Sequence, residues 1–120
     1  MVQRFGFEDL NVWKKAVAFG VEVINLVEKI ETSRKHFRLL EQIESSATSV
    51  AMNIAEGKGR FSKKEFRQYC YVARGSLYET ITLLIIMQNM NWISGEDYKQ
   101  IEEQGIEIAA MIKGLIKTLN

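Results

Sequence analysis

The chain contains no proline, one cysteine and one histidine among its 120 residues. A single cysteine, Cys70, excludes an intramolecular disulfide framework and any multi-cysteine metal site. The histidine, His36, does not complete the Glu-x-x-His pattern of di-iron bundles, because position 33 is a serine. No serine or cysteine stands beside it with the spacing of a nucleophile and its base. We therefore predict no catalytic residue, no metal and no cofactor, with Cys70 in the core and His36 solvated.

The chain also lacks a strong net charge, a signal peptide and a long apolar run. Its formal net charge is +1 and 47% of its residues are hydrophobic. The segment 1–6 has no apolar core followed by a small-residue cleavage site. No apolar run approaches the roughly 20 residues of a membrane helix. We expect a cytoplasmic protein without a membrane segment, folded as one domain over residues 1–120.

Apolar residues recur at steps of three and four in four windows, which is the pattern of one helix face. These windows predict helices at about 8–29, 33–56, 62–90 and 94–118. The segments between them are too short for crossover connections, so consecutive helices should run antiparallel. We predict an all-α protein, an antiparallel up-down-up-down four-helix bundle.

Residues typical of helix ends flank these windows. Ser62 with Glu65 forms a capping box, and Ser94 is expected to cap the last helix. Gly57 and Gly59 bracket the end of the second window. Glycine reaches positive φ without a Cβ penalty, so we predict that these two glycines make a tight reversal.

Two helices carry more apolar residues than one face needs. The first window has a stripe of Leu10, Trp13, Val17, Gly20, Ile24 and Val27, and a second strip of Ala16, Phe19, Val23 and Leu26. The third window adds a strip of Tyr71, Tyr78 and Ile85. A wide core-facing stripe is one interpretation. We favour the other, a homo-oligomer in which the extra width forms an interface.

The second window also carries a regular polar stripe of small and amide side chains. Such residues are indifferent helix formers, because their side chains compete for the backbone. The stripe could allow close approach of the third helix at Gly75 and Ser76, it could form a hydrogen-bond network, or it could bind a ligand. The predicted structural network consists of Gln42, Ser46, Ser49, Asn53, Glu56, Ser76 and Glu79.

Positive charge is concentrated between residues 58 and 74, where six cations stand against the single carboxylate of Glu65. The candidate nucleic-acid-binding residues are Lys58, Arg60, Lys63, Lys64, Arg67 and Arg74. Phe61, Tyr69 and Tyr71 are interleaved with them, and cations beside aromatic rings are the ingredients of RNA or single-strand binding. A solvated helix end and a scaffold that meets an acidic protein partner are the alternatives.

Four segments carry a family resemblance: Phe7-Glu8-Asp9-Leu10-x-x-Trp13, Gln42 followed by Ser45 to Val50, Asn53-Ile54-Ala55-Glu56-Gly57, and Phe66 through Ala73-Arg74-Gly75-Ser76-Leu77-x-Glu79. Together they resemble the four-helix bundle proteins encoded in intervening sequences of bacterial 23S ribosomal RNA genes, over about residues 5–119. The resemblance implies a homopentamer. The related accessory variability protein of diversity-generating retroelements implies nucleic acid, RNA or DNA, and a reverse transcriptase as possible partners. The resemblance supplies a context but no mechanism.

Overall fold

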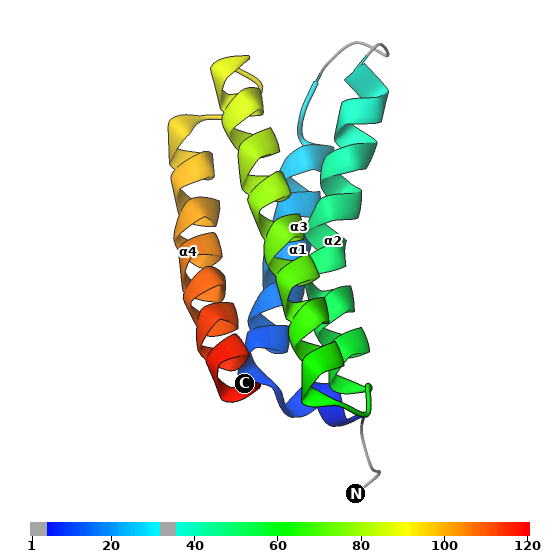
Figure 1. The fold of residues 1–120 in the computed structure, drawn as a ribbon. Coiled ribbons are helices and arrows are strands. Elements are labelled where there is room, and N and C mark those ends of the chain that lie inside the picture. Colours follow the sequence, from blue (N-terminus) through cyan, green and yellow to red (C-terminus); the bar gives the residue numbers. More distant parts are fainter. Residues whose placement is uncertain (1–4, 32–35) are drawn as a thin grey trace, which may run out of the picture.

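Four helices make up the fold in the computed structural model, which describes residues 5–31 and 36–120. A short 3-10 turn, η1 (Gly6–Asp9), precedes α1 (Asn11–Glu28), α2 (Phe37–Lys58), α3 (Lys63–Asn89) and α4 (Gly95–Thr118) (Figure 1). The described ranges contain no strand, and the all-α prediction is confirmed. The predicted first helix is divided into η1 and α1. The predicted start of the second helix at 33–35 lies outside the described residues.

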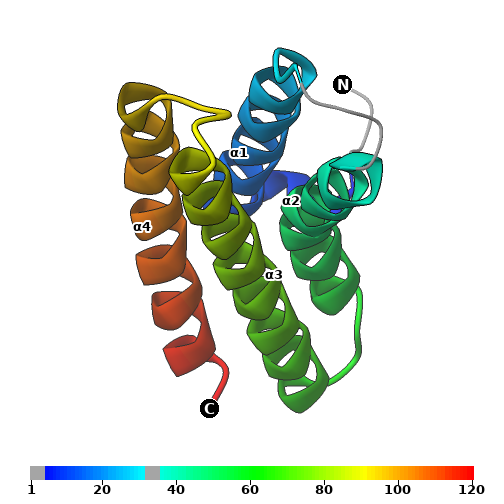
Figure 2. The same ribbon diagram turned by 90° about the horizontal axis from the view of Figure 1, so that it is seen from above.

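Neighbouring helices run antiparallel, because residue numbers that rise along one helix fall along the next. Each helix contacts the next in sequence, and α1 also contacts α4, so the four surround one core (Figure 2). On α2 and α3, Ser46 contacts Thr80, whereas Gly57 lies against Phe66. The other helix pairs follow the same rule. Along α1 and the preceding η1, Gly6 lies near Lys58 and Gly20 near Ala47 of α2. Arg67 bonds Leu119 whereas Leu77 lies against Gly105, and Lys15 pairs with Glu107 whereas Glu22 bonds Gln104.

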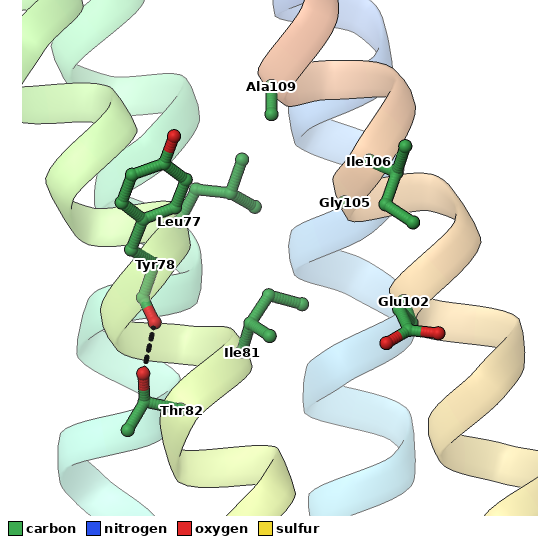
Figure 3. Close-up of a pocket in the computed structure, with 8 residues that line it drawn as sticks. All are labelled: Leu77, Tyr78, Ile81, Thr82, Glu102, Gly105, Ile106 and Ala109. Carbon is green, nitrogen blue, oxygen red and sulfur yellow. Dashed lines mark hydrogen bonds between the residues drawn. The ribbon is translucent and has the colours of Figure 1, made fainter.

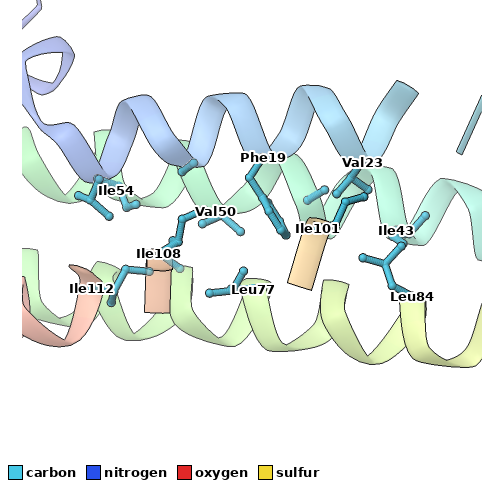
Figure 4. Packing of buried hydrophobic residues seen from close by; sticks show 14 of the residues in the cluster. Phe19, Val23, Ile43, Val50, Ile54, Leu77, Leu84, Ile101, Ile108 and Ile112 are labelled. Atoms are coloured by element: carbon cyan, nitrogen blue, oxygen red, sulfur yellow. The ribbon is translucent and has the colours of Figure 1, made fainter. Parts of the chain in front are cut away.

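The core is built from one apolar face of each helix. Phe19, Ile43, Leu77 and Ile108 represent the four helices and are fully buried or nearly so (Figure 4). Burying a side chain of this size stabilises the fold by about 1.5–3 kcal/mol. Cys70 is buried among them, and burial raises the pKa of its thiol to about 11.

The apolar face of α1 differs from the predicted one. The buried residues of α1 are Val12, Ala16, Phe19, Gly20, Val23 and Val27. Three of the four residues in the expected second strip therefore face the core, while Val17 and Ile24 of the expected main stripe line the outside of the α1–α2 contact. Two apolar strips on one helix are equivalent by periodicity, and only the position of the other helices decides which one is buried.

The turn from α2 to α3 contradicts the predicted role of its glycines. Gly57 remains inside α2, Gly59 has φ −80°, and no described glycine has positive φ. A Cβ on Gly57 would stand 2.7 Å from the Cβ of Tyr69 and 2.9 Å from a ring carbon of Phe66. Gly57 is therefore required for close helix packing, and not for a reversal of the chain.

The helix α3 passes a length and composition test for a membrane span, with a mean hydropathy of 1.2 over its most apolar segment. Such a segment is weak evidence by itself, because the core helix of a bundle has the same composition. In this structure Phe66, Cys70, Ala73, Leu77 and Leu84 of α3 are buried against the other helices. Packing in the bundle accounts for these residues, whereas Val72, Ile85 and Ile86 of the same helix remain exposed.

Candidate nucleic-acid interface

One end of the bundle, which we call the basic end, is formed by η1, the last turns of α2 and α4, and the first turns of α3. The side chain of Ser62 begins α3 by accepting a hydrogen bond from the Glu65 amide at 3.1 Å. This cap places Lys63 and Lys64 in the first exposed turn of α3, beside the exposed Lys58 of α2. Within residues 5–31 and 36–120, none of these three lysines makes an ion pair.

Arg60 also lies at the basic end, but its guanidinium is held by neighbours. Its Nη2 donates to the Glu56 carboxylate at 2.6 Å and to the Tyr69 hydroxyl at 2.6 Å, and the guanidinium lies 4.9 Å from the Tyr69 ring centre. Charge interaction with Tyr69, and then with Glu56, raises the pKa of Arg60. Arg60 is a fixed positive charge that Glu56 partly neutralises.

Two of the six predicted cations are placed differently from the rest. Arg67 is half-buried and donates to the Leu119 carbonyl at 2.7 Å and to Asn120 Oδ1 at 3.4 Å, so it satisfies the end of α4. Arg74 lies eleven residues after Lys63, roughly 16 Å along the helix, with its guanidinium 5.0 Å from the Tyr71 ring centre. The structure brings together Lys58, Arg60, Lys63 and Lys64, and leaves Arg74 apart.

The fold adds cations that the linear cluster did not include. Because α4 runs antiparallel to α3 and its end contacts Arg67, the exposed Lys113 and Lys117 belong to the same end as Lys63. Lys117 also stands in the last turn of α4, where a cation interacts favourably with the helix dipole. These lysines are about fifty residues from Lys63 in the sequence, so their proximity in space follows only from the antiparallel topology.

A cavity of about 490 Å³ opens between η1 and the last turn of α2. The Phe5 ring stacks on Phe7 with centres 5.5 Å apart and an interplanar angle of 6°, and Phe7 in turn lies 5.1 Å from Trp13. Phe5 remains 69% exposed. The cavity is lined by Phe5, Gly6, Phe7, Ala55, Glu56, Lys58, Gly59 and Arg60.

The predicted polar residues form hydrogen bonds between α2 and α3. Ser46 and Thr80 hydroxyls lie 2.8 Å apart, and the Ser76 hydroxyl donates to Ser49 at 2.9 Å. Asn53 donates to the Ser49 carbonyl and hydroxyl, each at 2.8 Å. Thr80, which is fully buried, is the residue that the sequence pattern missed.

Gln42 and Glu56, the first and last predicted members of the network on α2, differ in their partners. Gln42 donates to the Glu79 carboxylate at 3.4 Å on the surface, whereas Glu56 bonds Arg60 and does not join the network. Every buried side-chain nitrogen or oxygen in the described ranges has a hydrogen-bond partner. No buried polar group between α2 and α3 is therefore left unpaired for a ligand. The prediction that Gly75 allows close approach of the two helices is wrong, since a Cβ there would meet no atom within 4 Å.

Apolar grooves lie on two opposite sides of the bundle. The α3/α4 groove, of about 290 Å³, is lined by Leu77, Tyr78, Ile81, Thr82, Glu102, Gly105, Ile106 and Ala109 (Figure 3). The α1/α2 groove, of about 220 Å³, is lined by Ala16, Val17, Gly20, Val21, Ile24, Thr48 and Ala51. Exposed aliphatic side chains border each groove, including Val21 at 51% and Ile106 at 65% exposure.

Neither reactive group nor metal-binding cluster accompanies these surfaces in the part of the chain that the structure describes. No group of three or more His, Cys, Asp or Glu side chains is arranged to hold a metal ion there.

His36, expected to be solvated, is half-buried with its ring 4.7 Å from that of Trp92. Burial, and then the hydrogen bond to Glu102 at 2.9 Å, raises the pKa of Tyr98 to about 12, so its hydroxyl stays protonated.

Comparisons with known proteins place these features in a family. A family model described as "23S rRNA-intervening sequence protein" matches residues 8–114. A crystal structure from Bacteroides thetaiotaomicron, described as a protein with unknown function from the S23 ribosomal protein family, is 28% identical with a TM-score of 0.82. That match covers 88% of this chain and 98% of the other. No curated protein matches the chain. Neither matching description names an enzymatic activity.

Proposed function

Because this chain belongs to the 23S rRNA-intervening sequence protein family, we propose that it is a cytoplasmic, non-enzymatic oligomer that binds nucleic acid through its basic end. The observation that carries the proposal is the exposed group of Lys58, Lys63 and Lys64 at the α2–α3 turn. Lysines without carboxylate partners are the groups that contact phosphates and release counterions. Lys113 and Lys117 extend this charge onto α4.

The charge distribution supports the same end of the molecule. At the opposite end, which we call the acidic end, the described carboxylates are Glu28, Glu31, Glu41, Glu96 and Asp97, against Lys29, Arg38 and Lys99. The segment 32–35, which includes Arg34 and Lys35, is outside the described residues. The basic end carries seven cations against Glu8, Asp9, Glu56 and Glu65, so the described residues give it an excess of three positive side-chain charges; the cations are Lys58, Arg60, Lys63, Lys64, Arg67, Lys113 and Lys117. This local excess attracts a polyanion, even though the net charge of the chain is only +1.

Charge reversal at the basic end tests the proposal. We expect Lys63→Glu/Lys64→Glu to weaken binding to a labelled RNA by about tenfold or more at low salt, and to reduce the slope of log affinity against log salt. The matched control is Lys29→Glu/Lys99→Glu, which changes the net charge equally at the acidic end. Fluorescence anisotropy over a salt series measures both quantities, with structured and single-stranded RNA.

An equal loss of RNA affinity in the two double variants, or an RNA affinity that does not depend on salt, would overturn the proposal. A pull-down that retains a protein after nuclease treatment and fails with Lys63→Glu/Lys64→Glu would favour a protein partner, such as a reverse transcriptase, for the same surface. The Arg74→Glu variant separates the start of α3 from its middle. Arg74 lies away from the basic end, so its reversal should weaken RNA binding less than reversal of Lys63.

The oligomer in this proposal rests on the two apolar grooves. They lie on opposite sides of the bundle and differ in their residues, so a copy cannot present the same surface to both neighbours. The α3/α4 groove of one copy against the α1/α2 groove of the next gives a heterologous contact, which generates a closed ring when the rotation closes. The family resemblance implies five copies. A ring would gather several basic ends on one assembly and raise its avidity.

Two charged substitutions test this arrangement by light scattering. Ile106→Glu should disable the α3/α4 groove and Val21→Glu the α1/α2 groove, so each variant alone should be a monomer of 13.8 kDa. A mixture of the two retains one intact pair of grooves and should give a heterodimer of about twice that mass. A wild-type monomer, or a mixture that stays monomeric, would contradict the heterologous contact.

A further inference from the structure

We propose that the basic end recognises single-stranded nucleic acid, with one unpaired base in the cavity between η1 and α2 and another on Phe61. This inference rests on the proposed function, because it assigns the form of nucleic acid that the same end binds. The lysines supply phosphate contacts, which do not distinguish a duplex from a single strand. The exposed rings of Phe5 and Phe61 can make that distinction, because they stack only on unpaired bases.

Phe61 carries the first part of the argument. It lies in the turn between α2 and α3 with a relative exposure of 107%, so its ring packs against nothing in the bundle. Arg60 precedes it, and Lys63 and Lys64 follow within the next three residues. A fully exposed phenyl ring contributes nothing to the folded core, whereas a ring between cations can stack on a base whose phosphates lie on those cations.

The cavity beside η1 carries the second part. Its volume of about 490 Å³ falls within the range of small-molecule sites. The Phe5 and Phe7 rings form one wall, and the Glu56–Arg60 pair forms another. An inserted base would stack on the open Phe5 ring, while the Glu56 carboxylate could accept a hydrogen bond from an exocyclic amine.

The same geometry disfavours a duplex at this site. Glu56, Lys58 and Arg60 all line the cavity, and Arg60 is paired with Glu56. Lys58 is therefore the lining cation left to contact a phosphate, while the Glu56 carboxylate faces the base. Bases within a duplex are stacked on one another, so their faces are not available to Phe5 or Phe61. Only an unpaired nucleotide offers its face to a ring and its phosphate to a lysine together.

Neutral substitutions of the aromatic residues test the inference apart from charge. With a labelled 20-nucleotide single-stranded RNA, we expect Phe61→Ala and Phe5→Ala each to lose roughly tenfold in affinity, which is the effect of one stacked base. The salt slope should stay unchanged, since no phosphate contact is removed. The same strand annealed to its complement should bind more weakly and be indifferent to both substitutions. Single-stranded DNA of the same sequence, as a separate arm, identifies the sugar preferred.

Two controls make the result specific. Phe37→Ala removes a ring that is 61% exposed at the acidic end and should leave affinity unchanged, while Phe61→Trp should restore binding. Equal binding of single strand and duplex by wild-type protein, with no effect of either alanine variant, overturns the inference. The proposed function survives that result if Lys63→Glu/Lys64→Glu still weakens binding, and fails if it does not. A change in oligomeric mass on Phe61→Ala without a change in RNA affinity would assign Phe61 to a subunit contact and also overturns the inference.

Discussion

The two ends of α3 turn the chain by different means. At the basic end, between α2 and α3, the turn contains no residue with positive φ, and the buried Gly57 lets Tyr69 and Phe66 pack against the backbone. At the acidic end, between α3 and α4, Asn91 has φ 62°. The Trp92 amide donates to the Met87 carbonyl and the Asn91 amide to Gln88, each at 2.9 Å, which is the Schellman pattern.

The difference shows that a glycine near a helix end has two possible uses. One is to adopt positive φ, and the other is to leave space for a neighbouring side chain. In this chain glycine serves the second use at the basic end, while asparagine serves the first at the acidic end. Each use predicts a different response to alanine.

The largest expected effect is at Gly57. Gly57→Ala adds a Cβ 2.7 Å from the Cβ of Tyr69, so we expect the free energy of unfolding to fall by about 2–3 kcal/mol. Gly75→Ala is the matched control, because its Cβ would meet no atom within 4 Å and alanine favours the helix. That variant should gain about 0.5–1 kcal/mol. Urea denaturation measures both, and effects of the same sign would refute the assigned role of Gly57.

Alkaline pH should give the next effect, by ionising the Cys70 thiol and the Tyr98 hydroxyl. The pKa of Cys70 near the basic end is raised from 9.0 to about 11, so below pH 9 both the folded and unfolded states keep the proton. Between pH 9 and 11 the unfolded thiol ionises first, and stability should fall by on the order of 2 kcal/mol.

A variant separates this loss from other alkaline effects. In Cys70→Ala the decline between pH 9 and 11 should flatten. Tyr98, whose pKa is raised from 10.0 to about 12, should produce a second decline between pH 10 and 12, which Tyr98→Phe removes. Identical pH profiles for wild type and both variants would contradict these protonation states.

Substitution of Asn91 should give the next largest loss of stability. Alanine at φ 62° pays the steric cost of the left-handed region, so Asn91→Ala should lose about 1 kcal/mol of unfolding free energy. Asn91→Gly keeps access to that region and should be close to wild type. If both variants unfold at the wild-type urea concentration, the α3–α4 turn does not depend on this residue.

The smallest difference is expected between the two serine caps. Ser62 and Ser94 accept amide hydrogen bonds at 3.1 Å and 3.0 Å at the starts of α3 and α4. Each serine-to-alanine change should cost about 1 kcal/mol. Ser62 also donates to the Glu65 carboxylate at 3.2 Å, so Ser62→Ala should cost slightly more. Thermal unfolding of the two variants side by side would show whether the ranking is reversed.

Local signals were sufficient for the helices and their caps. The three–four spacing placed all four helices, and Ser62 and Ser94 cap helix starts as expected. The predicted capping box is present only in its serine half, because the Glu65 carboxylate accepts from the Ser62 hydroxyl and not from the Ser62 amide. These features depend on residues within one or two turns of one another, so the sequence contains them directly. The same holds for Cys70, whose apolar neighbours on α3 indicated burial.

Features that depend on the position of a second helix could not be predicted in the same way. The buried strip of α1 was misassigned because α1 has two apolar strips. Thr80 was missed because its partner Ser46 lies on another helix. Arg67 was counted as a free cation because its acceptor, the Leu119 carbonyl, is 52 residues away. In each case the missing information was the register between antiparallel helices.

The bond from Arg67 to Leu119 has a practical consequence for any binding experiment. It fixes the last residue of the bundle beside the first turns of α3, and η1 lies at that same end. A purification tag fused to Asn120 would place extra residues next to the lysines of the basic end. Affinities should therefore be measured after the tag has been cleaved.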